Sequence, residues 1–408
     1  MQLSLAQSAR TAQRKMTRGR FLYHVANPLP ATFLRGGTSK GIFLKRSDLQ
    51  ENPNEWTPIF QGIMGSPDPV YRRQLNGMGG GVSSLSKICV VGPPSNSPAN
   101  SVVDVEYTFV QVGIDDGELD LSGNCGNLSS MIGVFALDEG LCSPRLDGTG
   151  SFATVRSFNT NTSKVIDTTF PISSSHLADL DRPEVEMAGV PGQASRIILQ
   201  FVNPGGARTG KLLPTDSPID NLQLRDARLS SIPASLVDAT NPTVFIAAEH
   251  IAKAIHAEHQ GVSPDDLAQP DVVELIETIR QAGAVRMGLD PSTKAQPKIA
   301  ILSAPDLNDD ADVGIHAFSM GVLHKAVPMT VGLCLGVAAG VEGTIAHDII
   351  AARARARRGA AQDDLNLVRI RHPGGTVDVG AKFGEDGTVL NAQVVRTGRR
   401  LMKGVVWW

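Results

Sequence analysis

The sequence predicts an α/β protein made of two similar halves, and three observations support this fold class. With 408 residues, the chain is longer than a single hydrophobic core usually serves, so two domains are expected. Short β-type segments recur along the whole chain. Two stretches rich in small apolar residues, one after Cys125 and one after Pro328, each predict a helix with strands on both sides. We interpret this pattern as a weak internal duplication rather than an array of short repeats.

The composition is that of a soluble globular protein and argues against several classes of partner. Hydrophobic residues make up 41% of the chain, charged residues make up 19%, and a net charge of −3 gives no support to nucleic-acid binding. The longest apolar run, at about 327–341, is too short and too rich in glycine to span a bilayer, so no membrane partner is expected. The 4 cysteines lack CxxC spacing, which disfavours a zinc site or a disulfide framework and fits a reducing compartment.

The segment 1–27 differs from the rest of the chain because it contains Lys and Arg but no acidic residue, the first acid being Asp48. Interleaved apolar and basic residues are typical of a mitochondrial transit peptide, and the alternative is a basic leader with no targeting role. We therefore exclude this segment from the fold and keep both the mitochondrial matrix and the cytoplasm as expected locations.

The first half begins with two short strands, expected at 31–34 and 41–44, with the polar segment Arg35–Lys40 turning between them. A helix is expected to begin after Cys125 and to run to about Glu139. The other expected elements of this half are a glycine-rich loop at 76–81 and strands at 86–91, 102–112, 153–158, 163–170 and 196–202.

A strong breaker at 203–206 predicts a boundary between a domain over 28–203 and a domain over 204–399. The last strand, at about 400–408, is expected to return to the first domain. The other expected elements of the second half are strands at 243–248, 298–302, 368–371, 376–379 and 389–396 and helices at 264–287 and 328–339. At 311–320, the spacing of apolar residues fits neither a helix nor a strand throughout.

Cys125 is the first candidate for chemistry because it lies among Asn124, Gly126 and Asn127 at the expected start of a helix. Unpaired backbone amides at a helix start favour anions and tend to lower the pKa of a thiol. The alternative is a buried structural cysteine, but such a residue does not need flanking polar residues and glycines. We assign the other cysteines to packing.

Lys87 is the second candidate, since it follows a glycine-rich loop and Ser84 and Ser86 at the start of an apolar strand. Partial desolvation there would lower the pKa of the amine toward that of a usable base. The serine hydroxyls and glycine amides could hold a carboxylate beside the amine. The alternative is a strand-end lysine that reaches solvent.

Three further groups are weaker candidates for binding an anion. Arg35, Thr38, Ser39 and Lys40 form a turn that could be an anion nest or an ordinary hairpin turn. His324 precedes the second small-residue helix, and Thr330 is expected to cap that helix where the first half has Cys125. A threonine at this cap argues against a mechanism with two opposed thiols. The acidic residues at 309–312 do not follow the spacing of a metal-binding motif, so no metal site is expected.

Several motifs, in the same order along the chain, resemble those of the PrpF family. That family includes 2-methylaconitate cis–trans isomerase, methylitaconate isomerase, 4-oxalomesaconate tautomerase and aconitate isomerase. The resemblance extends from about residue 31 to the C-terminus. The motifs are Arg35-Gly-Gly-Thr-Ser-Lys-Gly41, Gly77-Met-Gly-Gly80, Ser83-Ser-Leu-Ser-Lys87, Asn124-Cys-Gly-Asn127, Thr209-Gly-Lys-Leu-Leu-Pro-Thr215, and Ser319-Met-Gly321 with His324.

The resemblance implies a diaminopimelate epimerase-like fold of two pseudo-symmetric domains, each with a mixed sheet around a central helix and with the active site between them. It also implies chemistry without a cofactor, with Lys87 and Cys125 as the catalytic residues. The substrate-binding residues are then expected to be Arg35, Thr38, Ser39, Lys40, Ser84, Ser86, Asn124, Gly126, Asn127, His324 and Thr330.

The expected function is an isomerase that moves a proton on an unsaturated tricarboxylate of the aconitate or 2-methylaconitate type. Lys87 is expected to remove the proton, and Cys125 either returns one or orients the substrate. The alternatives are a 4-oxalomesaconate-type tautomerase, an isomerase of a larger unsaturated acid, an amino-acid epimerase and a non-catalytic accessory protein of an aconitase-like dehydratase. The expected partner is a small di- or tricarboxylate, and a homodimer is the assembly we expect.

Overall fold

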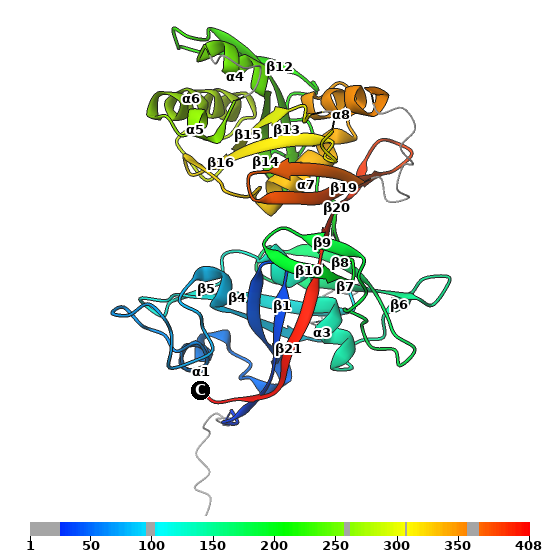
Figure 1. The fold of residues 1–408 in the computed structure, drawn as a ribbon. Coiled ribbons are helices and arrows are strands. Elements are labelled where there is room, and N and C mark those ends of the chain that lie inside the picture. Colours follow the sequence, from blue (N-terminus) through cyan, green and yellow to red (C-terminus); the bar gives the residue numbers. More distant parts are fainter. Residues whose placement is uncertain (1–24, 95–102, 257–261, 307, 357–366) are drawn as a thin grey trace, which may run out of the picture.

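The computed structural model describes residues 25–94, 103–256, 262–306, 308–356 and 367–408. The predicted basic leader therefore lies outside the described residues up to position 24, as does the predicted start of a strand at Val102. The chain folds into two lobes, one above the other in Figure 1, and each lobe combines a mixed sheet with helices. The predicted α/β class is confirmed.

In the lower lobe, some neighbouring strands are joined by hairpins and others by longer crossover connections. The hairpin β1 (Leu29–Gly36) and β2 (Ser39–Lys45) forms where it was predicted, and β3 (Lys87–Gly92) runs parallel to β2. Every residue of β3 is buried, as expected for an apolar central strand. The other elements are α1 (Thr57–Met64), β4 (Val105–Val112), β5 (Leu119–Asp120), β6 (Arg145–Leu146), β7 (Phe152–Asn159), β8 (Lys164–Pro171), β9 (Val185–Met187), β10 (Val190–Ala194) and 3-10 turns at Arg46–Asp48, Pro53–Glu55 and Ser83–Leu85.

The helix predicted after Cys125 is divided into α2 (Gly126–Ser129) and α3 (Ile132–Asp138). The Ser129 hydroxyl donates to the carbonyl of Cys125 over 3.1 Å, and the Ser130 hydroxyl donates to the carbonyl of Asn127 over 2.7 Å. Serine hydroxyls that bond to backbone carbonyls in this way compete with regular helical bonding and often bend helices. The prediction of one continuous helix was therefore wrong, although α3 still packs within the lobe against β7 and β8.

The upper lobe repeats the strand pairing of the lower lobe. The parallel and antiparallel contacts β14–β15, β15–β16, β16–β18 and β18–β19 match β2–β3, β3–β4, β4–β7 and β7–β8 in kind and order. The internal duplication inferred from the sequence is thus visible in the topology. The elements are β12 (Asp220–Gln223), β13 (Ser231–Ala239), β14 (Asn241–Ala247), α4 (Ala248–Ala254), α5 (Pro264–Leu267), α6 (Pro270–Arg286), β15 (Lys298–Ser303), β16 (Val313–Ser319), β17 (Val322–Leu323), α7 (Met329–Ala339), α8 (Ile345–Ala356), β18 (Leu367–His372), β19 (Gly375–Phe383) and β20 (Val389–Arg396).

The helix α7 is the central helix of the upper lobe. It is continuous, its residues from Val331 to Ala338 are buried, and it packs against β13, β14, β19 and β20. Small residues allow this close packing: a Cβ on Gly336 would lie 2.9 Å from the backbone nitrogen of Gly380.

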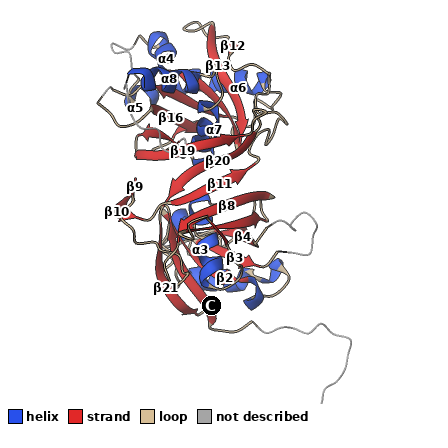
Figure 2. Cartoon of the chain, turned by 90° about the vertical axis from the view of Figure 1, so that its right-hand side faces the viewer, coloured by secondary structure: helices blue, strands red, loops and turns tan. Residues whose placement is uncertain are grey.

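Two strands connect the lobes. β11 (Ile197–Val202) pairs with β8 of the lower lobe and with β20 of the upper lobe, so strand pairing continues from one lobe to the other, as Figure 2 shows. The chain then crosses back after Arg396, and β21 (Gly398–Val406) pairs with β1. The last strand therefore begins at Gly398 rather than at about 400 and ends at Val406 rather than at 408. Within the described residues, no helix is both long and apolar enough to cross a membrane.

Candidate active site

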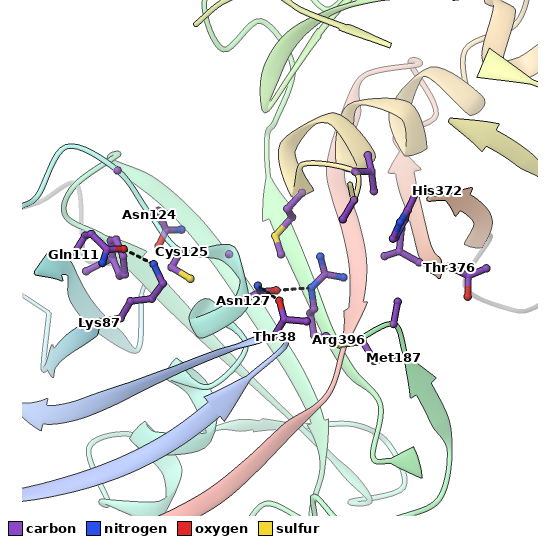
Figure 3. A pocket seen from close by; sticks show the side chains of 18 of the residues that line it. Thr38, Lys87, Gln111, Asn124, Cys125, Asn127, Met187, His372, Thr376 and Arg396 are labelled. Carbon is purple, nitrogen blue, oxygen red and sulfur yellow. Dashed lines mark hydrogen bonds between the residues drawn. The ribbon is translucent and has the colours of Figure 1, made fainter. Parts of the chain in front are cut away.

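A cavity of about 470 Å³ lies between the two lobes, and Figure 3 shows the side chains around it. The lower lobe contributes Lys87 and Cys125, and the upper lobe contributes the start of α7 and the turn between β18 and β19. Other lining residues include Thr38, Phe109, Gln111, Asp120, Gly123, Asn124, Gly126, Asn127, Met187, Val327, Met329, His372, Thr376 and Arg396.

Lys87 is the first residue of β3 and is only 9% exposed. Its amine donates to Oε1 of Gln111 and lies 5.2 Å from the centre of the Phe109 ring. The Gln111 amide is held in this orientation because its Nε2 donates to the carbonyl of Ser86 over 2.8 Å. The amine is thus desolvated and held at the cavity wall by neutral partners.

The glycine-rich loop supports Lys87 from behind rather than lining the cavity. The buried Gln74 side chain donates from Nε2 to the hydroxyls of Ser66 and Ser86, each over 2.8 Å. Ser86 is itself fully buried and donates to the carbonyl of Val112 over 2.9 Å. A Cβ on Gly77 would lie 2.2 Å from the amide of Gly65, so the loop packs closely on the end of α1. The structure brings neither Ser84 nor Ser86 into the cavity lining, because these residues form the turn that fixes the start of β3.

Cys125 is the residue before the first turn of α2 and is half-buried. Its thiol lies 3.8 Å from the hydroxyl of Ser39, to which it can donate. The neighbouring Asn124 is held by the phenol of Tyr107 over 3.2 Å and by the hydroxyl of Ser129 over 3.1 Å. The polar residues around Cys125 therefore fix the loop that presents the thiol.

Asn127 connects the hairpin turn to the upper lobe. Its Nδ2 donates to the Thr38 hydroxyl over 3.1 Å, and its Oδ1 accepts from Nε of Arg396 over 3.2 Å. The turn needs a glycine here, since Gly37 has a φ of +54° and a Cβ on it would lie 2.3 Å from Oδ1 of Asn127. Thr38, Asn127 and Arg396 thus form one hydrogen-bonded wall of the cavity (Figure 3).

Arg396 was missed by the sequence analysis and is the most unusual group in the cavity. It is the last residue of β20, at the point where the chain crosses back to the lower lobe, and it is 9% exposed. Burial lowers the pKa of its guanidinium to about 10. In the described part of the chain, no carboxylate forms an ion pair with it. A buried cation without a counter-ion indicates a site for an anionic ligand.

His372 was also missed, and its place at the end of a strand before Pro-Gly-Gly was the available signal. It is 8% exposed, and its Nδ1 accepts from the amide of Gly374 over 3.1 Å. Burial, followed by the charges of Arg396 and Arg371, lowers the pKa of the imidazole. The neutral ring therefore carries its proton on Nε2, which is available as a donor.

The structure does not bring five other predicted residues into the lining of this cavity. Ser39 is buried, and its hydroxyl accepts from the Cys125 thiol. Arg35 donates to the carbonyls of Gly37 and Thr397 over 3.0 and 3.2 Å and so holds the hairpin turn. Lys40 lies over the ring of Phe33, 5.8 Å from its centre. His324 is exposed in the loop before α7.

Thr330 is the fifth of these residues, and its expected role as a helix cap was wrong. The residue before the first turn of α7 is Pro328. Thr330 is the second residue of α7, where its hydroxyl accepts from Nδ2 of Asn241 over 3.5 Å. It lines a second cavity beside the first.

Among the residues that the structure describes, Cys125 is the only cysteine that lines the cavity. Cys334, in α7, is buried and donates to the carbonyl of Val237 over 3.4 Å, and burial raises the pKa of its thiol to about 12. An arrangement of two opposed thiols is therefore absent from this part of the chain. The described residues also contain no group of three or more His, Cys, Asp or Glu that could hold a metal ion.

Comparison with known proteins gives a consistent result. The family model "PrpF protein" matches residues 27–408. The chain is 33% identical to 2-methyl-aconitate isomerase from Shewanella oneidensis over 92% of this chain and 96% of that protein. It is 32% identical to 3-methylitaconate isomerase from Eubacterium barkeri, over 93% of this chain and 97% of that protein.

A more distant relative is 4-oxalomesaconate tautomerase from Pseudomonas putida, at 28% identity over 93% of this chain and 95% of that protein. Among solved structures, the fold matches methylitaconate-delta-isomerase with a TM-score of 0.79 and 32% identity, over 93% of this chain and 95% of that one. The chain therefore belongs to the PrpF family and is an isomerase.

Proposed function

We propose that the protein isomerises an unsaturated di- or tricarboxylate of the aconitate or 2-methylaconitate type by moving a proton, without a cofactor. The observation that carries this proposal is that Lys87 and Arg396 line one cavity and that neither has a carboxylate partner among the described residues. The buried guanidinium of Arg396 needs an anion, and Lys87 is held by neutral partners in the same cavity. A substrate carboxylate supplies the anion and brings the rest of the substrate to the amine.

The proposed reaction begins when the neutral amine of Lys87 takes an allylic proton from the substrate. The C–H bond breaks, an N–H bond forms, and the electron pair spreads into the conjugated carboxylate as a dienolate. Arg396 stabilises this developing charge more strongly than water would, because the cavity is partly desolvated. The Thr38 hydroxyl accepts from Asn127 and can donate to the carboxylate, while Asn127 orients the guanidinium.

The second step returns a proton to carbon. Cys125 gives the proton to the far end of the allyl system and is left as a thiolate. When the product leaves, Lys87 releases the proton that it took and the thiolate recovers one. Return to the far carbon moves the double bond, whereas rotation before return to the original carbon gives cis–trans isomerisation. The relatives named for methylaconitate, methylitaconate and oxalomesaconate support this class of acid.

The test is proton NMR of the purified protein in D₂O with cis-aconitate, trans-aconitate, 2-methylaconitate and 4-oxalomesaconate. We expect deuterium to enter the allylic position of at least one acid and an isomeric product to accumulate. If none of the four acids exchanges or changes, the proposed substrate class is wrong.

A variant pair tests the anion site itself. Arg396→Gln should raise KM for the active acid by about 10- to 100-fold, because a charged hydrogen bond to a carboxylate is lost. Arg399→Gln is the matched control, since Arg399 is exposed on β21 and lies outside the cavity. Equal KM values for the two variants would remove Arg396 from the substrate site.

A further inference from the structure

A second cavity of about 630 Å³ lies beside the first and has a different charge pattern. Its lining includes Lys164 and Arg208 but no Asp or Glu. Both side chains are exposed, and neither forms an ion pair with any described carboxylate. The side-chain amide of Gln296 can donate hydrogen bonds as well, whereas the lining hydroxyls of Ser122, Thr162 and Thr240 donate to protein acceptors. The lining is therefore suited to an anionic group on a flexible chain.

Arg208 is held at this cavity by a motif that has no contact with the first cavity. The carboxylate of Asp238 accepts from the backbone amides of Arg208 and Thr209 over 2.8 and 2.6 Å, and also from the Thr209 hydroxyl over 2.9 Å. Asp238 is fully buried, so this loop is fixed to β13. Thr209 begins the motif Thr209–Thr215 noted in the sequence analysis, and its bonds to Asp238 help to fix Arg208 at the cavity.

Met329 separates the two cavities. It is the first residue of α7 and lines both of them, together with Asn124 and Gly126 from the lower lobe. The contact is close, because a Cβ on Gly126 would lie only 2.0 Å from Sδ of Met329. The Met329 side chain therefore touches the residue directly after Cys125 and bridges the lobes between the cavities.

We propose that Met329 determines substrate length by closing the catalytic cavity against the second cavity, and that the second cavity takes the anionic end of a longer unsaturated acid when Met329 is shortened. This inference rests on the proposed function, since it assumes that the first cavity holds the reacting acid. Methionine suits such a wall because its unbranched side chain fills an irregular gap between two surfaces.

The experiment compares cis-aconitate with homologues whose acetate arm is longer by one or two methylene groups. For each acid, kcat/KM is measured with wild type, Met329→Ala, Met187→Ala and the double variant Met329→Ala/Arg208→Gln. Met187 is the matched control because it lines the catalytic cavity but not the second one. Thermal unfolding of each variant shows whether it is folded.

We expect Met329→Ala to shift the ratio of kcat/KM for the longest acid over cis-aconitate by at least about tenfold, the scale of a methylene in a closed pocket. The double variant should lose most of this shift, and Met187→Ala should not produce it. An unchanged ratio in folded Met329→Ala, or an equal shift in Met187→Ala, would overturn the inference.

The readouts also separate this inference from the proposed function. Failure of wild type to convert any acid counts against the proposed function alone. In that case the ratio of dissociation constants for the same acids, measured by calorimetry, tests Met329 in the same way. Should Met329→Ala bind the longest acid no better relative to cis-aconitate than wild type does, the second cavity has no role in binding it.

Discussion

The two lobes share one strand topology but differ in the chemistry that they bring to the cleft. Lys87 begins β3 of the lower lobe and bonds to Gln111 on β4, whereas Lys298 begins the matching strand β15 and bonds to Ser319 on β16. Of these two lysines, only Lys87 lines the cavity between the lobes. The thiols differ in the same way, because Cys125 precedes its helix while Cys334 is buried inside α7.

This difference shows that duplication preserved the framework more strictly than the reactive groups. The lower lobe carries the amine and the thiol. The upper lobe contributes neutral or apolar groups such as His372 and Met329, and Arg396 lies where the chain crosses between lobes. The cavity is therefore an asymmetric site inside a pseudo-symmetric scaffold, and the following variants test that asymmetry in matched pairs.

The largest effect is expected at the two matching lysines. Lys87→Met should lower kcat by at least about a thousandfold, because a general base is removed while the volume of the side chain is nearly kept. Lys298→Met should leave kcat within about threefold of wild type on the same reasoning. Steady-state assays with the active acid measure both, and comparable losses would show that both lobes supply a base.

The two thiols should differ by a smaller factor. Cys125→Ala is expected to lower kcat by about a hundredfold, the scale of one lost proton donor. Cys334→Ala should keep kcat but lower the free energy of unfolding by about 1 kcal/mol, since it leaves a small gap in a packed core. Turnover assays and urea unfolding measure the two quantities. Full activity in Cys125→Ala would reduce this residue to a binding role.

Two glycines, one in each lobe, have opposite expected effects. Gly126 tests whether the lobes must touch beside Cys125, and Gly332 serves as the comparison. Gly126→Ala should lower kcat/KM by about tenfold, because the new methyl group would collide with Met329 and shift the thiol. The double variant Gly126→Ala/Met329→Ala should recover activity toward the same acid. In α7, Gly332→Ala should be stabilising by about 0.5–1 kcal/mol, since alanine favours helix and the nearest atom would be only in ordinary contact. Failure of the double variant to recover would mean that the clash is not the cause.

The smallest effect concerns acid stability, which should differ between the lobes. Among the residues that the structure describes, the histidines with lowered pKa values are His316, His324 and His372, and all three lie in the upper lobe. Below the unfolded pKa of about 6.5, the unfolded chain binds these protons more readily than the folded chain, so stability falls as pH falls. Urea unfolding between pH 7 and 5 should therefore show a smaller loss for His372→Gln than for wild type, and an equal or larger loss would contradict the assignment.

Much of the framework could be predicted because it depends on local patterns. The hairpin of β1 and β2, the buried strand β3 and the helix α7 follow from apolar runs bounded by glycine and polar turns. Lys87 and Cys125 were identifiable for the same reason, since unusual flanking residues mark each of them.

Other parts of the site depend on contacts between distant segments and could not be read locally. Arg396 lies in an ordinary strand pattern, and only the pairing of β20 with β11 brings it to Asn127. Ser86 looks like a ligand-binding serine, but the buried Gln74 side chain binds it from behind. The interruption after α2 depends on which way two serine hydroxyls turn, and composition does not specify that.

The pairing of β21 with β1 has a consequence for how the chain is made. The lower lobe is discontinuous, because its β21 follows the entire upper lobe in the sequence. During synthesis, β1 therefore lacks this neighbour until the whole upper lobe has been made. Strands β12 to β20 of the upper lobe are consecutive, so Arg396 at the end of β20 and the strand β21 that completes the lower lobe leave the ribosome one after the other.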